Sequence, residues 1–390
     1  MSHTAIAIPG LDRIGGAERQ AMLLAKGLCR RGWRVSVVAL SGSGGAAATE
    51  LRDAGIAFVS LEMRKGLADP RGWVRLNRWL WSERPDVLHA HLPHAAWLAR
   101  WSRLAAPIPV VMDTLHSSNT GDLGRRLGYR CSRWLTDHVT AVSRATSATH
   151  LMAGMVGRNQ LSLVANGIAV DAWKPGATTR EAARRELGIA NSFLWLAAGR
   201  LEAVKDYSTL LEAMAGMPQE ADLLVLGSGP MGNELRQLAE RLGVALHVRF
   251  LGFDPKVVRW MNAADGFVLA SRYEGLPMVL LEAGACGLPA VATDVAGTRE
   301  VIVHDRTGLL ARPHDACSLG ATMTKLMRMP AEERRAMGDR ARRRVIEQFN
   351  METVLDQWEE LYTYLLERSR RRGVRLSTRE ALARASAISA

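Results

Sequence analysis

Asp265-Gly-Phe-Val-Leu-Ala-Ser-Arg-Tyr-Glu-Gly-Leu-Pro-Met-Val-Leu-Leu-Glu282 is the stretch that decides the fold. It opens with a short apolar run that is typical of a buried strand, and residues 280–287 are rich in helix formers. The stretch therefore predicts a strand, a loop and the start of a helix. Pro277 suits the first helical position, where its missing N–H removes no hydrogen bond.

The predicted helix start is a candidate anion site. We expect the amides of Met278, Val279 and Leu280 to be unpaired at the positive end of the helix dipole. Glu274 lies in the loop, and Glu282 lies about one turn into the helix. Two carboxylates beside such a helix end suit a ligand that carries both phosphates and hydroxyls, such as a nucleotide sugar.

Length and charge narrow the class of protein. A chain of 390 residues favours two domains. The net charge of +12 indicates an anionic partner (nucleic acid, phosphorylated ligand or membrane surface) or simply a basic, soluble surface. The four cysteines form no CxxC pair, which argues against a zinc site or a disulfide framework and favours a cytoplasmic protein. The N-terminus does not read as a signal peptide, and no apolar run reaches the roughly 18 residues that a membrane span needs.

Strands and helices alternate along the chain. Strands of the first half are predicted at 4–9, 35–40, 57–61, 87–91, 110–113, 138–142 and 161–165. A second sheet opens at 193–198. Such alternation indicates parallel sheets with helices on both faces, and ligands of these sheets lie beyond the carboxyl ends of the strands.

Candidate residues follow two strands of the first half. Gly15 and Gly16 precede a helix and would let a phosphate approach the backbone, although a plain flexible loop fits as well. His116 follows the strand at 110–113 and could hydrogen-bond a reacting sugar, or be a structural histidine. His89 and His91 share one face of a strand and superficially resemble a metal pair. With no third ligand at suitable spacing, packing within the sheet is the favoured interpretation.

Two cations follow the first strand of the second half. Arg200 and Lys205 lie just after the strand at 193–198. Arg binds phosphate in a bidentate manner and Lys acts as a point charge, so the pair suits a diphosphate. Ordinary surface charges are the alternative.

A glycine pattern supports a competing hypothesis. Gly227, Gly229 and Gly232 form GxGxxG after a strand, with Asp254 farther along, which is the dinucleotide fingerprint of an NAD-dependent oxidoreductase. The match lies in the middle of the second half and not at its first strand. Pro230 at a helix start explains the glycines as turn residues.

Two segments of the first half combine arginine with tryptophan. They span residues 71–81 and 125–134, and the second carries Arg126, Arg130 and Arg133 at helical spacing. This pattern is typical of a helix on an anionic membrane interface, and an ordinary domain helix with a solvated arginine face is the alternative. We find no nucleic-acid-binding module and expect no nucleic-acid partner.

Six motifs in one order resemble the glycosyltransferases of family 4, which have the two-domain GT-B fold. The motifs are Gly15-Gly16-Ala17-Glu18, Asn166-Gly167-Ile168, Gly199-Arg200-Leu201 with Lys205, Gly227-Ser-Gly-Pro230, Leu251-Gly252-Phe253, and Glu274-Gly-Leu-Pro with Glu282. The last is similar to the family's paired-glutamate pattern. The resemblance covers nearly the whole chain.

The resemblance implies a full set of site residues. The implied catalytic residues are His116, Glu274, Arg200 and Lys205. The implied donor-binding residues are Gly16, Gly199, Arg200, Lys205, Gly229, Phe253, Glu274, Gly275, Leu276, Pro277, Met278, Val279 and Glu282. No metal ligand and no cofactor is implied.

The resemblance also implies individual roles. Arg200 and Lys205 bind the diphosphate of the donor. Glu274 orients hydroxyls of the transferred sugar and Glu282 binds the ribose. His116 lies beside the sugar near the reacting carbon. Gly16 approaches the diphosphate, and the backbone near 250–253 holds the base.

The expected architecture is two Rossmann-like parallel-sheet domains that face a central cleft. Residues 1–170 form an acceptor domain, 171–190 a linker, and 191–350 a donor domain. A helix at 351–369 returns to the first domain, and 370–390 forms a basic, mobile tail.

The expected activity is retaining, metal-independent transfer of a hexose-type sugar from a UDP- or GDP-sugar to a hydroxyl acceptor. The expected acceptor is a lipid-linked or surface-polysaccharide intermediate, and the expected location is the cytoplasm, with attachment to the inner face of its membrane. A sugar-nucleotide epimerase of the same architecture is the second alternative.

Overall fold

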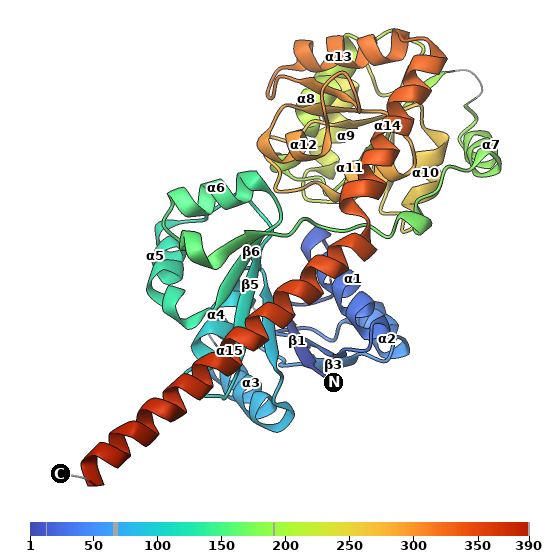
Figure 1. The fold of residues 1–390 in the computed structure, drawn as a ribbon. Helices are drawn as coiled ribbons and strands as arrows, with labels where there is room; N and C mark the ends of the chain where they lie inside the picture. The colour runs from blue at the N-terminus through green and yellow to red at the C-terminus, as the bar shows by residue number, and fades with distance from the viewer. Residues whose placement is uncertain (13, 65–68, 190–191, 389–390) are drawn as a thin grey trace. The chain divides into compact units, whose positions relative to one another are not determined.

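The short apolar runs of the first half form a parallel sheet of seven strands in the order β3-β2-β1-β4-β5-β6-β7. A computed structural model describes the chain except residues 13, 65–68, 190–191 and 389–390 (Figure 1). The central strands are buried on both faces, as expected for a covered parallel sheet. The strands are β1 (His3–Ile8), β2 (Arg34–Ala39), β3 (Ala57–Ser60), β4 (Val87–His91), β5 (Val110–Leu115), β6 (His138–Ala141) and β7 (Leu161–Leu163).

Helices cover both faces of this sheet. Apolar residues of α3 and α4 join one face of the strands in a single core cluster. The helix α15 contacts the opposite face, where His89 of β4 meets Tyr362. The helices of this unit are α1 (Gly16–Arg30), α2 (Gly45–Asp53), α3 (Pro70–Glu83), α4 (Pro93–Ser102), α5 (Leu123–Ser132), α6 (Arg144–Met152) and most of α15 (Met351–Ile388).

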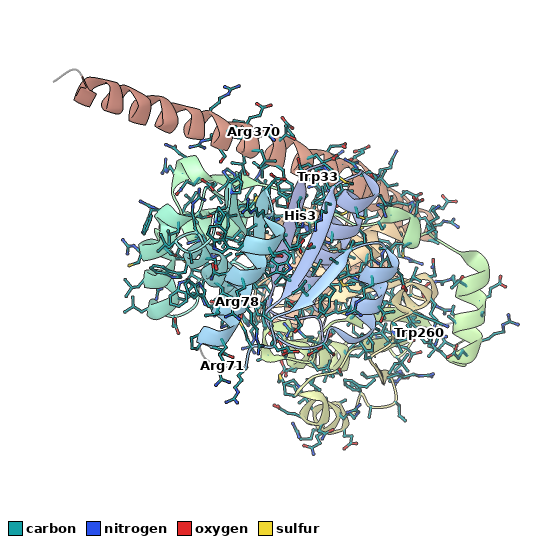
Figure 2. The ribbon with its side chains drawn as sticks, turned by 90° about the horizontal axis from the view of Figure 1, so that it is seen from below. His3, Trp33, Arg71, Arg78, Trp260 and Arg370 are labelled. Carbon is teal, nitrogen blue, oxygen red and sulfur yellow. The ribbon has the colours of Figure 1, made fainter. Side chains whose placement is uncertain are left out.

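The C-terminal helix buries one apolar face. Trp358, Tyr362 and Leu365 of α15 are buried. Glycine at position 27 of α1 admits Leu355, because a Cβ at Gly27 would overlap its methyl groups. Figure 2 shows Trp33 beside this helix, where its Nε1 donates to Glu359 Oε1 at 2.8 Å.

The second half forms a parallel sheet of six strands in the order β10-β9-β8-β11-β12-β13. Its first strand, β8, is central, and the chain turns to opposite sides of it at β9 and β11. The gap between β8 and β11 is therefore the topological switch point, where such sheets bind ligands. The strands are β8 (Phe193–Ala198), β9 (Ala221–Leu226), β10 (Val248–Gly252), β11 (Gly266–Leu269), β12 (Ala290–Thr293) and β13 (Leu309–Ala311).

Helices also cover both faces of the second sheet. Apolar residues of α8, α9 and α13 form one core cluster with the strands. The helices are α7 (Ala177–Glu186), α8 (Tyr207–Ala215), α9 (Gly232–Arg241), α10 (Val257–Ala263), α11 (Met278–Ala285), α12 (Ala296–Val301), α13 (Ala316–Arg328) and α14 (Ala331–Phe349).

The chain divides into two compact units. Unit 1 contains Met1–Ala165 and Val354–Ala390, and unit 2 contains Asn166–Thr353. Inside the segment predicted as a linker, α7 is part of unit 2, because Arg180 and Arg184 both pair with Asp265.

A mobile tail was expected from residue 370 onward. In the structure, α15 continues as a helix through Ile388. Residue 190 of the predicted linker and residues 389–390 of the predicted tail lie outside the described residues. Within the part of the chain that the structure describes, no helix is both long and apolar enough to cross a membrane.

Candidate active site

An ion pair joins the carboxyl ends of β8 and β11 in unit 2. Lys205 Nζ lies 2.6 Å from Glu274 Oε1, and Ser271 Oγ donates to the same oxygen at 2.6 Å. Lys205 ends the 3₁₀ turn η4 (Ala203–Lys205), and Glu274 lies in the loop between β11 and α11. Both side chains are less than one-fifth exposed. A charged pair is thus fixed at the switch point of the sheet.

Hydrogen bonds and one ion pair fix the loops after β8 and β11 relative to each other. Arg272 N donates to Val204 O at 2.9 Å, and the Arg272 guanidinium contacts Asp206 Oδ1 at 3.1 Å. Thr293 Oγ1 donates to Ser271 O at 2.6 Å. Asp206 is almost fully buried, so its carboxylate is a fixed anchor. The sequence motifs gave no sign of this support, because its members lie at the ends of three separate strands, β8, β11 and β12.

Glycines let two neighbouring loops press together beside this pair. Gly227 has φ of 135°, and a Cβ there would overlap the carbonyl oxygen of Gly199. A Cβ at Gly229 would likewise overlap the backbone of Leu201, whose N–H donates to Ser228 O at 3.0 Å. The loops after β8 and β9 therefore need glycine for packing.

The first residue of α8 holds the loop after β8 through a protonated phenol. Tyr207 Oη donates to Gly199 O at 3.3 Å. Burial, and then the negative charge of Glu274, raise the pKa of the Tyr207 phenol. Tyr207 therefore remains a neutral donor that holds the loop after β8.

This packing corrects the dinucleotide interpretation of the glycine pattern. Gly227, Gly229 and Gly232 follow β9, which is the neighbour of the first strand and not that strand itself. Asp254 accepts hydrogen bonds from Trp260 Nε1 at 2.7 Å and Lys256 N at 2.8 Å. Its carboxylate thus supports the start of α10.

The start of α11 differs in two details from its prediction. Pro277 is the N-cap and Met278 the first helical residue, one position later than expected. The Leu280 amide donates to Pro277 O at 3.1 Å, so the prediction that this amide is unpaired is wrong. The loop before the helix is also packed, since a Cβ at Gly297 would overlap the carbonyls of Glu274 and Gly275.

Glu282 lies inside the unit rather than on its surface. Its side chain belongs to the buried face of α11, one turn before Cys286. Burial, followed by the charge of Glu282, raises the pKa of the Cys286 thiol to about 12. The expected ribose contact of Glu282 remains a prediction.

Arg200 and Phe253 are more exposed. The Arg200 side chain is 70% exposed and pairs with Glu202 at 2.9 Å. Phe253 follows β10 and is 78% exposed as a residue, after Gly252 at φ of 76°. Phe253 and Leu251 border a cavity that also includes Trp260. Both predicted ligand residues are therefore accessible in unit 2.

The other predicted residues belong to unit 1. Gly16 begins α1, and the carboxylate of Glu18 accepts from Gly15 N at 3.0 Å as in a capping box. His116 directly follows β5, as predicted. Its Nε2 lies 2.8 Å from His91 Nδ1, a contact that the sequence did not indicate.

His89 has a structural role. Its Nδ1 bonds Tyr362 Oη at 2.6 Å and its Nε2 bonds Thr114 Oγ1 at 2.7 Å. Both ring nitrogens are thus occupied, which confirms packing within the sheet as the explanation for this residue. Burial lowers the pKa of His89 to about 3 and that of His116 to about 4, so both imidazoles are neutral near pH 7.

The surface of unit 1 around α5 is both basic and apolar. Only Tyr129 and Ser132 of the helix are buried. The exposed side chains of α5 and the following turn η1 (Arg133–Leu135) include Leu123, Leu127, Trp134, Arg126, Arg130 and Arg133. Figure 2 labels Arg71 and Arg78 of α3, the other basic helix, and both are exposed.

Two family models match successive parts of the chain. Residues 14–172 match Glycosyltransferase Family 4, and residues 179–344 match Glycosyl transferases group 1. N-acetyl-alpha-D-glucosaminyl L-malate synthase of Bacillus anthracis is 32% identical over 296 residues, which cover 72% of this chain and 75% of that protein. The chain belongs to glycosyltransferase family 4. It is therefore a glycosyltransferase, and the oxidoreductase hypothesis is wrong.

One further curated relative and one solved structure are also similar to this family 4 glycosyltransferase. UDP-Gal:alpha-D-GlcNAc-diphosphoundecaprenol alpha-1,3-galactosyltransferase of Escherichia coli is 22% identical over 311 residues, 76% of this chain and 80% of that protein. The crystal structure of Anabaena HepE with UDP-glucose has a TM-score of 0.82 at 22% identity and covers 93% of this chain and 99% of that chain. This likeness identifies the GT-B fold.

Proposed function

We propose that this family 4 glycosyltransferase moves a hexose-type sugar from a UDP- or GDP-sugar to a hydroxyl acceptor with retention of configuration. The observation that carries the proposal is the Lys205–Glu274 pair at the switch point of unit 2. Lys205, Arg200 and the start of α11 are suited to the charge that develops on a leaving diphosphate. Glu274 would bind hydroxyls of the transferred sugar.

In this proposal, unit 1 binds the acceptor. His116 would hydrogen-bond the sugar near the reacting carbon, and Gly16 would lie close to phosphate oxygens. Glu274 is not proposed as a nucleophile: Lys205 and Ser271 hold its Oε1, and its carboxylate would orient the sugar through hydroxyl contacts. The leaving phosphate would instead take the proton of the acceptor hydroxyl on the same face of the sugar.

The names of two relatives support a lipid-linked acceptor, whereas the Bacillus anthracis relative is named for L-malate. The Escherichia coli relative is named for UDP-Gal and for a diphosphoundecaprenol substrate. A lipopolysaccharide core biosynthesis glycosyltransferase of Rhizobium meliloti is 27% identical over 318 residues, 81% of this chain and 86% of that protein. We extend this acceptor class, with assembly of surface polysaccharide, to the present chain.

A nucleotide-release assay tests the proposal. UDP-, GDP- and ADP-sugars are each incubated with the full chain, with and without a lipid-linked acceptor. Nucleotide release that depends on the acceptor supports a transferase, whereas conversion of the donor alone would indicate the epimerase. Retention predicts a product with the anomeric configuration of the donor, and metal independence predicts unchanged turnover in EDTA.

Variants of Glu274 test its role. Glu274→Ala is expected to lower turnover well beyond threefold, because a lost contact of this kind costs about 1–3 kcal/mol. Glu274→Gln keeps the shape of the side chain and separates charge from packing. Glu212→Ala, at an exposed position of α8, is the control and should leave turnover unchanged. Turnover of Glu274→Ala within threefold of the parent would contradict the role.

We also propose that the basic, apolar surface around α5 binds an anionic membrane on the cytoplasmic side. Arginines supply attraction to lipid head groups, and exposed Trp134 and Leu127 supply apolar contact. Charge reversal of Arg126, Arg130 and Arg133 is expected to abolish binding to vesicles that contain anionic lipid. The matched control reverses three exposed arginines of unit 2, namely Arg328, Arg335 and Arg343. Unchanged vesicle binding by the α5 variant would exclude this surface.

A further inference from the structure

One buried carboxylate lies between three loops at the carboxyl edge of the second sheet. Asp206 Oδ1 lies 3.1 Å from Arg272 Nη2, in the loop after β11, and Asp206 Oδ2 lies 3.2 Å from His314 Nδ1, in the loop after β13. The Asp206 side chain is 1% exposed, whereas those of Arg272 and His314 are 47% and 57% exposed. A single carboxylate therefore links the loops after β8, β11 and β13.

The backbone of Asp206 is unusual for the position that this residue occupies. Asp206 is the N-cap of α8, where an aspartate ordinarily accepts a hydrogen bond from an amide of the first helical turn. Its side chain accepts no such bond, and its φ of 50° is a left-handed conformation that is strained for a residue other than glycine. Local rules of this kind are broken where a residue serves another purpose. The carboxylate of Asp206 is thus used for contacts between loops and not for capping.

The contact of Asp206 with Arg272 lies beside the Lys205–Glu274 ion pair. Asp206 directly follows Lys205, and Arg272 is two residues before Glu274. The backbone N–H of Arg272 also donates to Val204 O at 2.9 Å. Two adjacent residues after β8, a cation and an anion, therefore each pair with a residue of opposite charge after β11.

Loss of Arg272 would disturb Lys205 directly. Asp206 would then be a buried carboxylate with His314 as its remaining contact, and an imidazole is an ion-pair partner only when it is protonated. A buried charge without a counter-ion is strongly unfavourable, so the segment would move to bring the carboxylate to water or to another cation. Because Lys205 is the neighbouring residue in the chain, its ammonium would move away from Glu274.

We infer that Asp206 and Arg272 are positioning residues, whose ion pair holds Lys205 against Glu274 across the two loops while His314 supports Asp206 from a third loop. Neither Asp206 nor Arg272 needs to touch a substrate for this role. The effect on the Lys205–Glu274 pair is a property of the free protein. Only its consequence for sugar transfer rests on the proposed function.

The coupling between Lys205 and Glu274 tests the inference in the free, full-length protein. A double-mutant cycle of Lys205→Met and Glu274→Gln is measured by urea unfolding in the parent and is then repeated in the presence of Arg272→Ala. We expect Arg272→Ala to reduce the coupling factor in the unfolding equilibrium constant by at least about threefold. Unchanged coupling would overturn the inference, whether or not the protein transfers a sugar.

Two further substitutions separate the ion pair from general stability. Arg272→Lys keeps a cation beside Asp206 and should retain the coupling of the parent. Asp206→Gly removes the carboxylate without leaving a buried charge, and glycine adopts a φ of 50° without strain, so this variant should fold. It should nevertheless lose coupling as Arg272→Ala does. If Arg272→Ala does not fold, Asp206→Gly decides the question.

Steady-state kinetics with the active sugar donor test the consequence for catalysis. We expect Arg272→Ala and Asp206→Gly to lower kcat by about tenfold with donor KM within about threefold, and Arg272→Lys to stay within about threefold of the parent. Loss of coupling with unchanged kcat would support positioning of the Lys205–Glu274 pair and would contradict the role of that pair in the proposed function. The two failures are therefore distinguishable.

Arg299→Ala is the matched control. Arg299 is an exposed arginine of α12 whose Nε lies 2.5 Å from Oδ1 of Asp294, in the segment between β12 and α12. This pair lies at the same edge of the sheet but connects no two loops. Arg299→Ala should change neither the coupling nor kcat. Equal effects of Arg299→Ala and Arg272→Ala would overturn the positioning role.

Discussion

Lys205 Nζ and Glu274 Oε1, 69 residues apart in sequence, lie 2.6 Å apart and connect the carboxyl ends of β8 and β11. Among the ion pairs of the described residues, Lys205 and Glu274 pair with each other and with no other charged side chain. The contact therefore orients the two charges toward one point of the sheet edge. Its strength can be measured separately from any catalytic role.

A double-mutant cycle on this pair should reveal strong coupling. Lys205→Met and Glu274→Gln are each expected to lower the free energy of unfolding by about 1–3 kcal/mol, because each leaves a mostly buried partner unpaired. The double variant should lose less than the sum of the two. Urea unfolding at fixed pH measures the free energy of unfolding of the parent, the two single variants and the double variant.

The exposed pair Lys325–Asp305 is the control for that cycle. Both of its side chains are more than half exposed at an N–O distance of 2.8 Å. Solvent screening should keep its coupling below about 1 kcal/mol. Additive effects at Lys205 and Glu274 would show that the buried pair contributes no more than a surface one.

Glycine at position 227 is expected to be essential for stability. Gly227→Ala would bring a methyl group into the carbonyl of Gly199, so one of the two loops must move. We expect a loss of at least about 3 kcal/mol in the free energy of unfolding. Gly243→Ala is the matched control, since Gly243 also has positive φ, 71°, but open space around it. Its cost should be only about 1 kcal/mol, from backbone strain. Equal losses in thermal unfolding would contradict the role of loop contact.

Much of the fold could be predicted because parallel sheets have a strong signature. Buried runs such as the one that contains Trp195 carry apolar residues on both faces, and helices must intervene between parallel strands. The ends of these strands then indicate where Lys205, Glu274 and His116 lie. Helix boundaries were predicted less well, since Leu280 closes a tight first turn on Pro277 that composition does not encode.

Contacts between loops could not be predicted from one sequence. The partnership of Asp206 with Arg272, and that of His91 with His116, depend on strand order and on side-chain direction. The order β8-β11 follows from how the chain turns at the switch point, not from spacing. One clue was available for the histidines: His91 ends one predicted strand, His116 follows another, and both strands were expected to end at the same edge.

The buried ion pair of Arg100 and Asp113 should respond differently from a surface pair. Both side chains are 1% exposed, and the guanidinium also donates to Ser132 Oγ at 3.1 Å, which ties α5 to β5. Arg100→Met should cost about 3–5 kcal/mol because Asp113 stays buried and uncompensated. The double variant Arg100→Met, Asp113→Leu should recover part of that loss. A cost below about 1 kcal/mol for the single variant, measured by urea unfolding, would contradict this account.

The neutral histidines of unit 1 should make the protein sensitive to acid. The folded-state pKa of His89 is lowered to about 3 and that of His116 to about 4, below the ordinary 6.5. Between about pH 6.5 and pH 4 the unfolded chain therefore binds protons that the folded chain does not. Stability is full above pH 6.5 and falls as the pH is lowered, by up to about 1.4 kcal/mol per pH unit for each histidine.

Urea unfolding at pH 6.5 and pH 5.0 measures this slope before most carboxylates titrate. His89→Asn keeps a group that can bond Tyr362 Oη at the position of Nδ1, but it removes one titrating site, so the pH dependence should become shallower by up to about 1.4 kcal/mol per unit. His94→Asn, at an exposed position of α4, should leave the slope as it is in the parent. A slope that is the same in His89→Asn as in the parent would mean that the charged form of His89 is accommodated in the folded sheet. In that case the hydrogen bonds to Tyr362 and Thr114 would have to persist in the imidazolium, with both hydroxyl groups acting as acceptors.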